Sequence, residues 1–296
     1  MAKKALLLVS CSIFLWASAF VVNRYLNAQM NPHAIICLRL VLAGIIMLPY
    51  IFMIKVKLSD FIDIALIGFT GIAGYSICVI FGQVTVDAGT TAFIVSQTPV
   101  FSVISAYLFS YQTVNRVVIG GMTLSCAGIA LIYWSKNGGQ FSFEPGILWI
   151  LGACFAQSIY FVLQKRFLRK YKPIDVTALA TVASGIPALL FLPFIQTGTV
   201  PIGNLALIGY LAIFPSIVAY FLWAKAIQNS SAIKVTNALY FLPFVTIFQS
   251  WIFLSEVPSA IEVVGGIISL IGASIAHKFN QETLKNSAVK IKQGQA

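Results

Sequence analysis

Apolar residues fill ten long stretches of this chain, and short polar connections separate them. Most stretches approach the ~20 residues that a helix needs to cross a bilayer, and no connection is long enough to hold a soluble domain. Proline, glycine and asparagine mark the connections, as at Asn31-Pro32 and Lys172-Pro173. The pattern predicts an all-α membrane protein with ten transmembrane helices, at residues 5–22, 33–54, 61–81, 90–109, 117–134, 145–163, 174–194, 204–223, 233–253 and 259–277.

The composition also indicates a membrane protein that spans a lipid bilayer. Hydrophobic residues make up 59% of the 296 residues and charged residues only 9%, whereas soluble domains carry about 25% charged residues. The net charge of +11 would suggest nucleic acid in a soluble chain, but here the basic residues lie between apolar stretches, so we expect no nucleic acid partner. The first stretch resembles a signal peptide ending at Ala17-Ser18-Ala19. We interpret it as an uncleaved span, because ten spans account for more of the chain.

The basic residues predict the orientation in the membrane. If the N-terminus is cytoplasmic, 16 of the 19 lysines and arginines fall on the inner side, including the five between Lys165 and Lys172. Only Arg24 and Lys136 fall on the outer side, and Arg39 lies within the second span. Cytoplasmic loops are enriched in Lys and Arg. We therefore predict a multi-pass protein of the cell (cytoplasmic or inner) membrane with both termini cytoplasmic.

One module is written twice in the sequence. The first repeat covers residues 1–138 and the second 139–278, and residues 279–296 form a polar tail that we expect to be frayed. Each repeat has five spans, an odd number, so the second repeat enters the membrane from the opposite side. This predicts two inverted-topology five-helix repeats. An offset of 144 residues superposes five special pairs: Pro99 and Pro243, Gln112 and Glu256, Gly121 and Gly265, Ser125 and Ser269, Gly128 and Gly272.

Helix breakers lie at matching places in the two repeats. Pro99 and Pro243 fall near the middle of the fourth and ninth spans, and Gly71 of the third span falls on Pro215 of the eighth. Proline removes a backbone hydrogen bond and kinks a helix. Matched discontinuities point to a transport site between the repeats, and a purely structural kink is the alternative. We predict these four residues as hinges, and Glu256 in a short outer loop as a gate or a helix cap.

Arg39 is the only charge well within a span. An intramembrane charge is costly unless it is paired or reaches the interface, and it suggests function by default. A planar guanidinium is suited to a substrate carboxylate. The alternatives are snorkelling to the interface or a structural tie to backbone carbonyls, and the sequence favours neither interpretation.

Polar and aromatic residues on several spans could line a binding pocket, since ligand pockets combine apolar walls with a few hydrogen-bonding groups. Trp223 and Gln83 belong to this set but lie near predicted helix ends, so we interpret them as interfacial residues. The predicted substrate-binding or pore-lining residues are Trp16, Arg39, Tyr75, Gln97, Gln157, Tyr160, Tyr220, Asn237 and Tyr240.

Catalytic and metal chemistry find little support. The five cysteines lie in apolar segments without metal-ligand spacing, and His33 and His277 form no cluster. We predict no cofactor, no metal and no enzymatic activity. The glycines of the fifth and tenth spans are interpreted as packing residues, because helices in lipid approach closely through small side chains.

With spans and repeat in place, the sequence resembles the drug/metabolite transporter superfamily, in its EamA-like ten-helix branch. The resemblance rests on residues 16–20, Arg39-Leu40, residues 219–227, Pro243-Phe244 and Ser255-Glu256, with the glycines of the tenth span. It covers essentially the whole chain. Gln112 and Gln157 depart from it, because one repeat has Gln112 where the other has Glu256, and Gln157 stands where the first repeat has Trp16. The resemblance implies a transporter of small molecules, and family members export amino acids, other metabolites or toxic compounds.

The sequence thus predicts a membrane transporter of small metabolites that exports amino acids or related compounds by alternating access and functions as a monomer in the bilayer. A multidrug efflux pump and a passive channel-like permease are the alternatives. All eight acidic residues lie near predicted helix ends or in loops. Because proton-coupled carriers commonly hold a carboxylate near the midplane, we expect transport to follow the gradient of the substrate itself.

Overall fold

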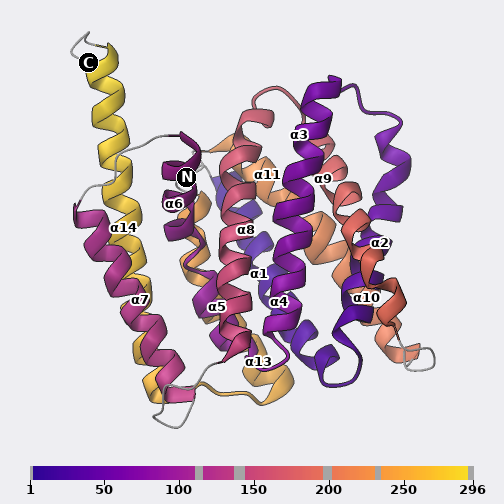
Figure 1. Cartoon of the computed structure of the whole chain (residues 1–296), viewed down its shortest axis with the longest axis horizontal. Helices are drawn as coiled ribbons and strands as arrows, with labels where there is room; N and C mark the ends of the chain where they lie inside the picture. The colour runs from indigo at the N-terminus through magenta and orange to yellow at the C-terminus, as the bar shows by residue number, and fades with distance from the viewer. Residues whose placement is uncertain (1–2, 111–115, 137–143, 196–201, 231–234, 293–296) are drawn as a thin grey trace.

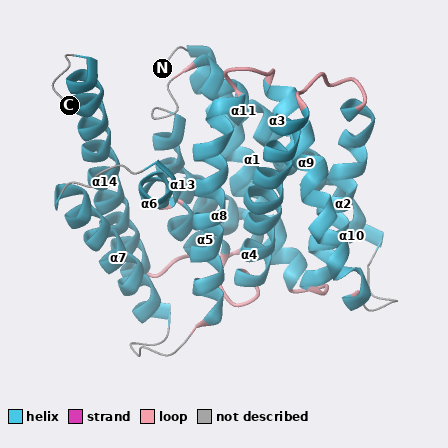
Figure 2. Cartoon of the chain, turned by 45° about the horizontal axis from the view of Figure 1, so that its top comes forward, coloured by secondary structure: helices cyan, strands magenta, loops and turns pink. Residues whose placement is uncertain are grey.

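The computed structural model describes residues 3–110, 116–136, 144–195, 202–230 and 235–292, and all regular elements in these ranges are helices (Figures 1 and 2). Their order begins with α1 Lys3–Asn27, α2 Pro32–Ile51, α3 Leu58–Gly68, η1 Phe69–Gly74, α4 Tyr75–Gly82, α5 Ala88–Val95, α6 Thr98–Ser110 and α7 Arg116–Lys136. It continues with α8 Pro145–Phe167, α9 Pro173–Ala188, η2 Leu189–Phe194, α10 Ile202–Ile213, η3 Phe214–Val218, α11 Ala219–Asn229, η4 Asn237–Phe241, α13 Leu242–Leu254 and α14 Ala260–Lys292.

The helices account for the ten predicted spans. Within the described ranges, seven helices are long and apolar enough to cross a membrane, and Arg116–Ile132 and Ala260–Ala276 are shorter apolar helices. The remaining predicted span is divided between α5 and α6. The predicted membrane fold is therefore confirmed. The tail differs from expectation, because α14 continues as a helix to Lys292 rather than fraying after residue 278.

The last helices of the two repeats, α7 and α14, pack against each other in opposite directions (Figure 1). A Cβ atom added at Gly121 would meet the backbone of Gly272, and one added at Gly128 would meet Gly265. The 144-residue offset equates Gly121 with Gly265 and Gly128 with Gly272. In the contact each glycine of one helix meets the counterpart of the other glycine. The seam therefore has the symmetry of an inverted repeat, and the predicted packing role of its glycines is confirmed.

The same exchange relates the central helices. Helix α1 packs against α11 and α13, and α8 packs correspondingly against α4 and α6. Helices α2 and α9 meet directly, with Gly44 facing Gly185. Helix α1 of the first repeat corresponds to α8 of the second, α4 to α11 and α6 to α13. Each contact that α1 makes with the second repeat is therefore matched by one that α8 makes with the first.

Each predicted breaker falls at an interruption of a helix. Gly71 lies in η1 and Pro215 in η3, and both segments are π-helical, with a widened turn. Pro99 follows the break between α5 and α6, and Pro243 follows the 3₁₀-helical η4 at the start of α13. The sequence predicts these irregularities because glycine and proline weaken the regular helix where it must widen or bend.

Candidate functional site

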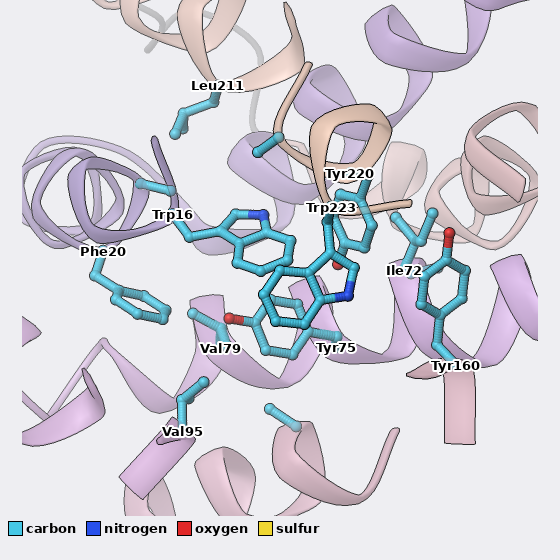
Figure 3. Packing of buried hydrophobic residues seen from close by; sticks show 14 of the residues in the cluster. Trp16, Phe20, Ile72, Tyr75, Val79, Val95, Tyr160, Leu211, Tyr220 and Trp223 are labelled. Atoms are coloured by element: carbon cyan, nitrogen blue, oxygen red, sulfur yellow. The ribbon is translucent and has the colours of Figure 1, made fainter. Parts of the chain in front are cut away.

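Aromatic side chains from α1, α8 and α11 meet at the centre of the bundle (Figure 3). The Trp223 ring lies 5.0 Å from the Trp16 ring and stacks on Phe161 at 4.8 Å between centroids. The Tyr220 ring lies edge-on to Trp16 at 5.3 Å and to Tyr160 at 5.5 Å. We call Trp16, Tyr160, Phe161, Tyr220 and Trp223 the central aromatic cluster. All five are buried.

A backbone carbonyl of η3 binds the indole of α1. Trp16 Nε1 donates to the Pro215 carbonyl oxygen at 3.2 Å. Backbone groups that a widened or proline-containing turn leaves without a helical partner are satisfied in a membrane only by neighbouring protein groups. Trp16 therefore gives the Pro215 carbonyl a hydrogen-bond donor, and the same bond holds the indole in one orientation.

Arg39 of α2 points at the same segment. Its side chain is buried, 4% exposed, and Nε donates to Ser216 Oγ at 2.9 Å. A second donor, Nη1, reaches Asn23 Oδ1 at 3.5 Å. The Ser216 hydroxyl donates onward to the Leu211 carbonyl at 2.8 Å. In the described part of the chain, no carboxylate forms an ion pair with Arg39, so the charge is held by neutral oxygens.

The opposite side of the cluster is built around Gly71 of η1. A Cβ atom at Gly71 would overlap Tyr160 Cβ, so the absence of a side chain lets α8 approach η1. Gln157, one turn earlier on α8, accepts a hydrogen bond from the Tyr220 hydroxyl at 3.1 Å. Buried Tyr160 Oη and Trp223 Nε1 have no hydrogen-bond partner among the described residues. The cluster thus contains two polar atoms that an additional molecule could satisfy.

Six predicted site residues are brought together here, but three are placed elsewhere. Trp16, Arg39, Tyr75, Gln157, Tyr160 and Tyr220 all lie at or beside the central aromatic cluster. Gln97 stays at the break between α5 and α6, where it accepts from Ser125 Oγ at 2.6 Å. Asn237 is exposed, and Tyr240 packs against apolar residues beside α14. The hydropathy pattern indicated that these side chains lie in a span, but not which neighbours they face.

Two residues interpreted as interfacial are instead buried. Trp223 is 0% exposed within the cluster, because α11 continues to Asn229 rather than ending at residue 223. Gln83 is also buried, and its Nε2 donates to the Phe20 carbonyl at 3.0 Å. Ser216, Asn23 and Phe161 were not predicted as site residues. Only Phe161 carried a sequence signal, since an offset of 141 residues places it on Phe20.

Ion pairs lie toward the two ends of the bundle. At the end predicted to be outside, Arg24 Nε lies 3.2 Å from Glu256 Oε1, and Arg24 Nη1 donates to the Gln83 and Val84 carbonyls. Ser250 Oγ donates to Glu256 Oε2 at 3.1 Å. This network ties α1 to α4 and α13.

Glu256 does not cap a helix. The capping arrangement at the start of α14 is formed by Ser259 and Glu262, whose side chains bond each other's backbone N–H groups. Gln112, which the offset places opposite Glu256, lies outside the described residues. Of the two roles proposed for Glu256 from the sequence, only the gate stays as a prediction.

The predicted inner end has its own network. Lys170 Nζ lies 3.1 Å from Asp60 Oδ2, and the Tyr171 hydroxyl donates to the same oxygen at 2.7 Å. This hydrogen bond to Asp60 raises the pKa of Tyr171 above its usual value. Arg166 and Asp63 form an exposed pair at 2.8 Å. The described ranges contain no group of three or more His, Cys, Asp or Glu side chains that could hold a metal ion.

Comparison with known proteins places this architecture among transporters. The EamA-like transporter family matches residues 3–134 and 144–276. The "Uncharacterized transporter YdfC" of Bacillus subtilis is 31% identical over 274 residues, which cover 90% of this chain and 89% of that protein. The "Probable terminal-alkyne amino-acid exporter" of Streptantibioticus cattleyicolor is 29% identical over 75% of each chain.

More distant proteins are also similar to this chain. The "S-adenosylmethionine/S-adenosylhomocysteine transporter" of Chlamydia muridarum is 23% identical over 85% of each chain. A solved crystal structure superposes with a TM-score of 0.65 and 17% identity, covering 95% of this chain and 99% of that one. At this identity the superposition shows a shared fold alone.

Proposed function

The chain belongs to the EamA-like transporter family and is a multi-pass membrane transporter of small molecules; on that premise we propose that it exports amino acids or related carboxylates by alternating access. The observation that carries the proposal is Arg39. A fully buried guanidinium without a carboxylate partner in the described part of the chain is costly in a membrane. A substrate carboxylate would supply the missing negative charge.

The chemistry of the site fits such a substrate. Guanidinium offers five N–H donors, and only Nε and Nη1 of Arg39 are hydrogen-bonded to described residues, so Nη2 is available for a carboxylate oxygen. The central aromatic cluster is connected to Arg39 through Pro215 and Ser216 of η3. It would receive the apolar part of the substrate, and the unpartnered Tyr160 hydroxyl and Trp223 indole would bind polar groups.

The irregular segments support alternating access. In carriers built from inverted repeats, one repeat rocks against the other around a site formed by discontinuous helices. Here η1 and η3 contribute Gly71 and Pro215 to opposite sides of the cluster. The Arg24–Glu256 pair would close the outer end, and the Asp60–Lys170 pair the inner end. Transport following the substrate gradient remains our expectation for energy coupling.

The test begins with metabolite profiling of cells that overproduce the chain, followed by transport of the exported compound into proteoliposomes. We expect Arg39→Lys to lower kcat/KM by roughly tenfold or more, because an ammonium lacks the bidentate fork. For the decarboxylated amine of that compound, Arg39→Lys and the unaltered chain should transport at the same rate. Arg169→Lys, at an exposed position, is the matched control. Equal loss for both compounds would leave Arg39 only a structural role.

We also propose that both termini are cytoplasmic in the cell membrane, as the distribution of basic residues predicts. In a background without native cysteines, Lys170→Cys should react with a membrane-impermeant thiol reagent only after the cells are opened. Lys170 is more than half exposed, so a reagent on its own side can reach it. Labelling of Lys170→Cys in sealed cells would contradict this orientation.

A further inference from the structure

A groove of about 440 Å³ lies between α1, α10 and α13, away from the central aromatic cluster. Phe14 and Ser18 of α1, Leu207 and Tyr210 of α10, and Gln249 and Phe253 of α13 are among its lining residues. Phe14 and Phe253 are 57% and 73% exposed. Because exposed apolar surface of a transmembrane bundle faces lipid, the groove opens toward the bilayer.

Two hydroxyl groups of the groove, those of Ser18 and Tyr210, are hydrogen-bonded to each other, and their other contacts indicate which one donates. Ser18 Oγ donates its only proton to the Leu15 carbonyl at 2.8 Å. The 2.5 Å contact between Ser18 Oγ and Tyr210 Oη therefore uses the tyrosine proton. Tyr210 Oη is left with lone pairs only, and so acts as an acceptor.

Gln249 supplies a second acceptor. Its side chain is 4% exposed, and the amide lies with Nε2 toward the Phe14 carbonyl, 3.5 Å away. Oε1 is buried and has no hydrogen-bond partner among the described residues. A buried acceptor without a partner is unfavourable until a donor reaches it.

The corresponding place in the first repeat lacks these acceptors. The offset of 144 residues places Gln249 on Ser105 and Tyr210 on Leu66. Ser105 Oγ is already paired with Ser158 Oγ at 2.6 Å, and leucine has no polar atom. The two acceptors therefore belong to one repeat and are not a consequence of the repeated architecture.

We propose that this groove is a binding site for an amphipathic molecule with an alkyl body and a head that donates hydrogen bonds, such as an amine or an alcohol. The apolar walls accept the alkyl chain, and Gln249 Oε1 and Tyr210 Oη accept the donors of the head. A carboxylate head only accepts hydrogen bonds and would face these two acceptors without a proton between them, so it should bind more weakly than an amine or an alcohol. The ligand enters from the lipid side. This site is independent of Arg39.

The test measures binding of radiolabelled octylamine to the full chain in nanodiscs of phosphatidylcholine, whose headgroup donates no hydrogen bond. Unlabelled octanol should compete for the site, and octanoate should compete much less. Gln249→Leu should weaken octylamine binding about tenfold, and Leu207→Trp, which fills the groove, should abolish it. Thr246→Val is the matched control, since Thr246 bonds the Leu242 carbonyl within α13 and does not line the groove.

Two results would overturn the proposal. One is competition by octanoate as strong as that by octanol, which is measured on the unaltered chain and so does not depend on the folding of any variant. The other is unchanged octylamine binding in both Gln249→Leu and Leu207→Trp. Arg39→Lys should bind octylamine like the unaltered chain, so failure here and failure of the carboxylate site are separate outcomes.

Discussion

The π-helical segments η1 and η3 occupy corresponding places in the two repeats, but the chain uses them in different ways. Within η3, the Pro215 carbonyl accepts the Trp16 indole and Ser216 accepts from Arg39. In η1, Gly71 serves close packing with Tyr160. In the described part of the chain, no side chain from another helix donates to the η1 backbone. Both repeats contain the widened turn, but among the described residues only η3 accepts hydrogen bonds from side chains of other helices.

The side chains around these segments repeat the contrast. The offset of 144 residues places Trp223 on Val79 and Tyr220 on Ser76, so the aromatic residues of α11 have no aromatic counterparts in α4. A symmetric backbone with unequal side chains can move in a symmetric way and still hold one substrate in one orientation. The three predictions below test this contrast between a packing segment and a recognition segment.

Gly71→Ala should have the largest effect on stability. The added methyl group would overlap Tyr160 Cβ, which cannot turn away because it is fixed to the α8 backbone. We expect the free energy of unfolding to fall by about 3 kcal/mol, the upper end of the usual cost of overpacking. Thermal unfolding of the purified chain in detergent measures it. Gly74→Ala is the matched control in the same segment, because its methyl would lie 3.6 Å from Ala156 Cβ, an ordinary contact. Equal stability of the two variants would contradict the packing role of η1.

Ser216→Ala should have an intermediate effect, because it removes the oxygen that binds Arg39 Nε. Hydrogen bonds to buried charges contribute about 2 kcal/mol, so we expect a loss of that size in unfolding measurements. Ser184→Ala is the control, since Ser184 is buried but bonds only the Thr181 carbonyl of its own helix. If both variants lose the same stability, η3 is not specialised for Arg39.

Glu256→Gln should have the smallest effect. The substitution makes the two repeats alike at this position, since the other repeat has Gln112. The Arg24–Glu256 pair is 30% exposed on both sides, and such pairs contribute at most about 1 kcal/mol. The loss should shrink further in high salt, because salt screens exposed charges. Unfolding at low and high salt measures it, with Glu144→Gln as the control. A loss above that size, unchanged by salt, would mean that Glu256 contributes more than an exposed ion pair.

The sequence predicts the spans, the repeat and the positions of the irregular segments, because these follow from hydropathy, chain length and the backbone chemistry of glycine and proline. It does not predict which polar side chains converge. Trp223 is interpreted from the sequence as interfacial because the predicted span ends at residue 223, although α11 continues to Asn229. Ser216 gave no signal, since a serine is ordinary in a membrane helix until the structure brings Arg39, distant in sequence, next to it.

The seam between α7 and α14 has a consequence for how such a chain can be assembled. Gly121 meets Gly272, and Gly128 meets Gly265, so each helix presents the same patch to the other. A contact of this kind is isologous, the type that joins identical subunits into closed dimers. The seam itself does not require the two repeats to be covalently joined. Two separate five-helix chains inserted in opposite orientations could form it equally well, and linking them in one polypeptide ensures that each is always made with its partner.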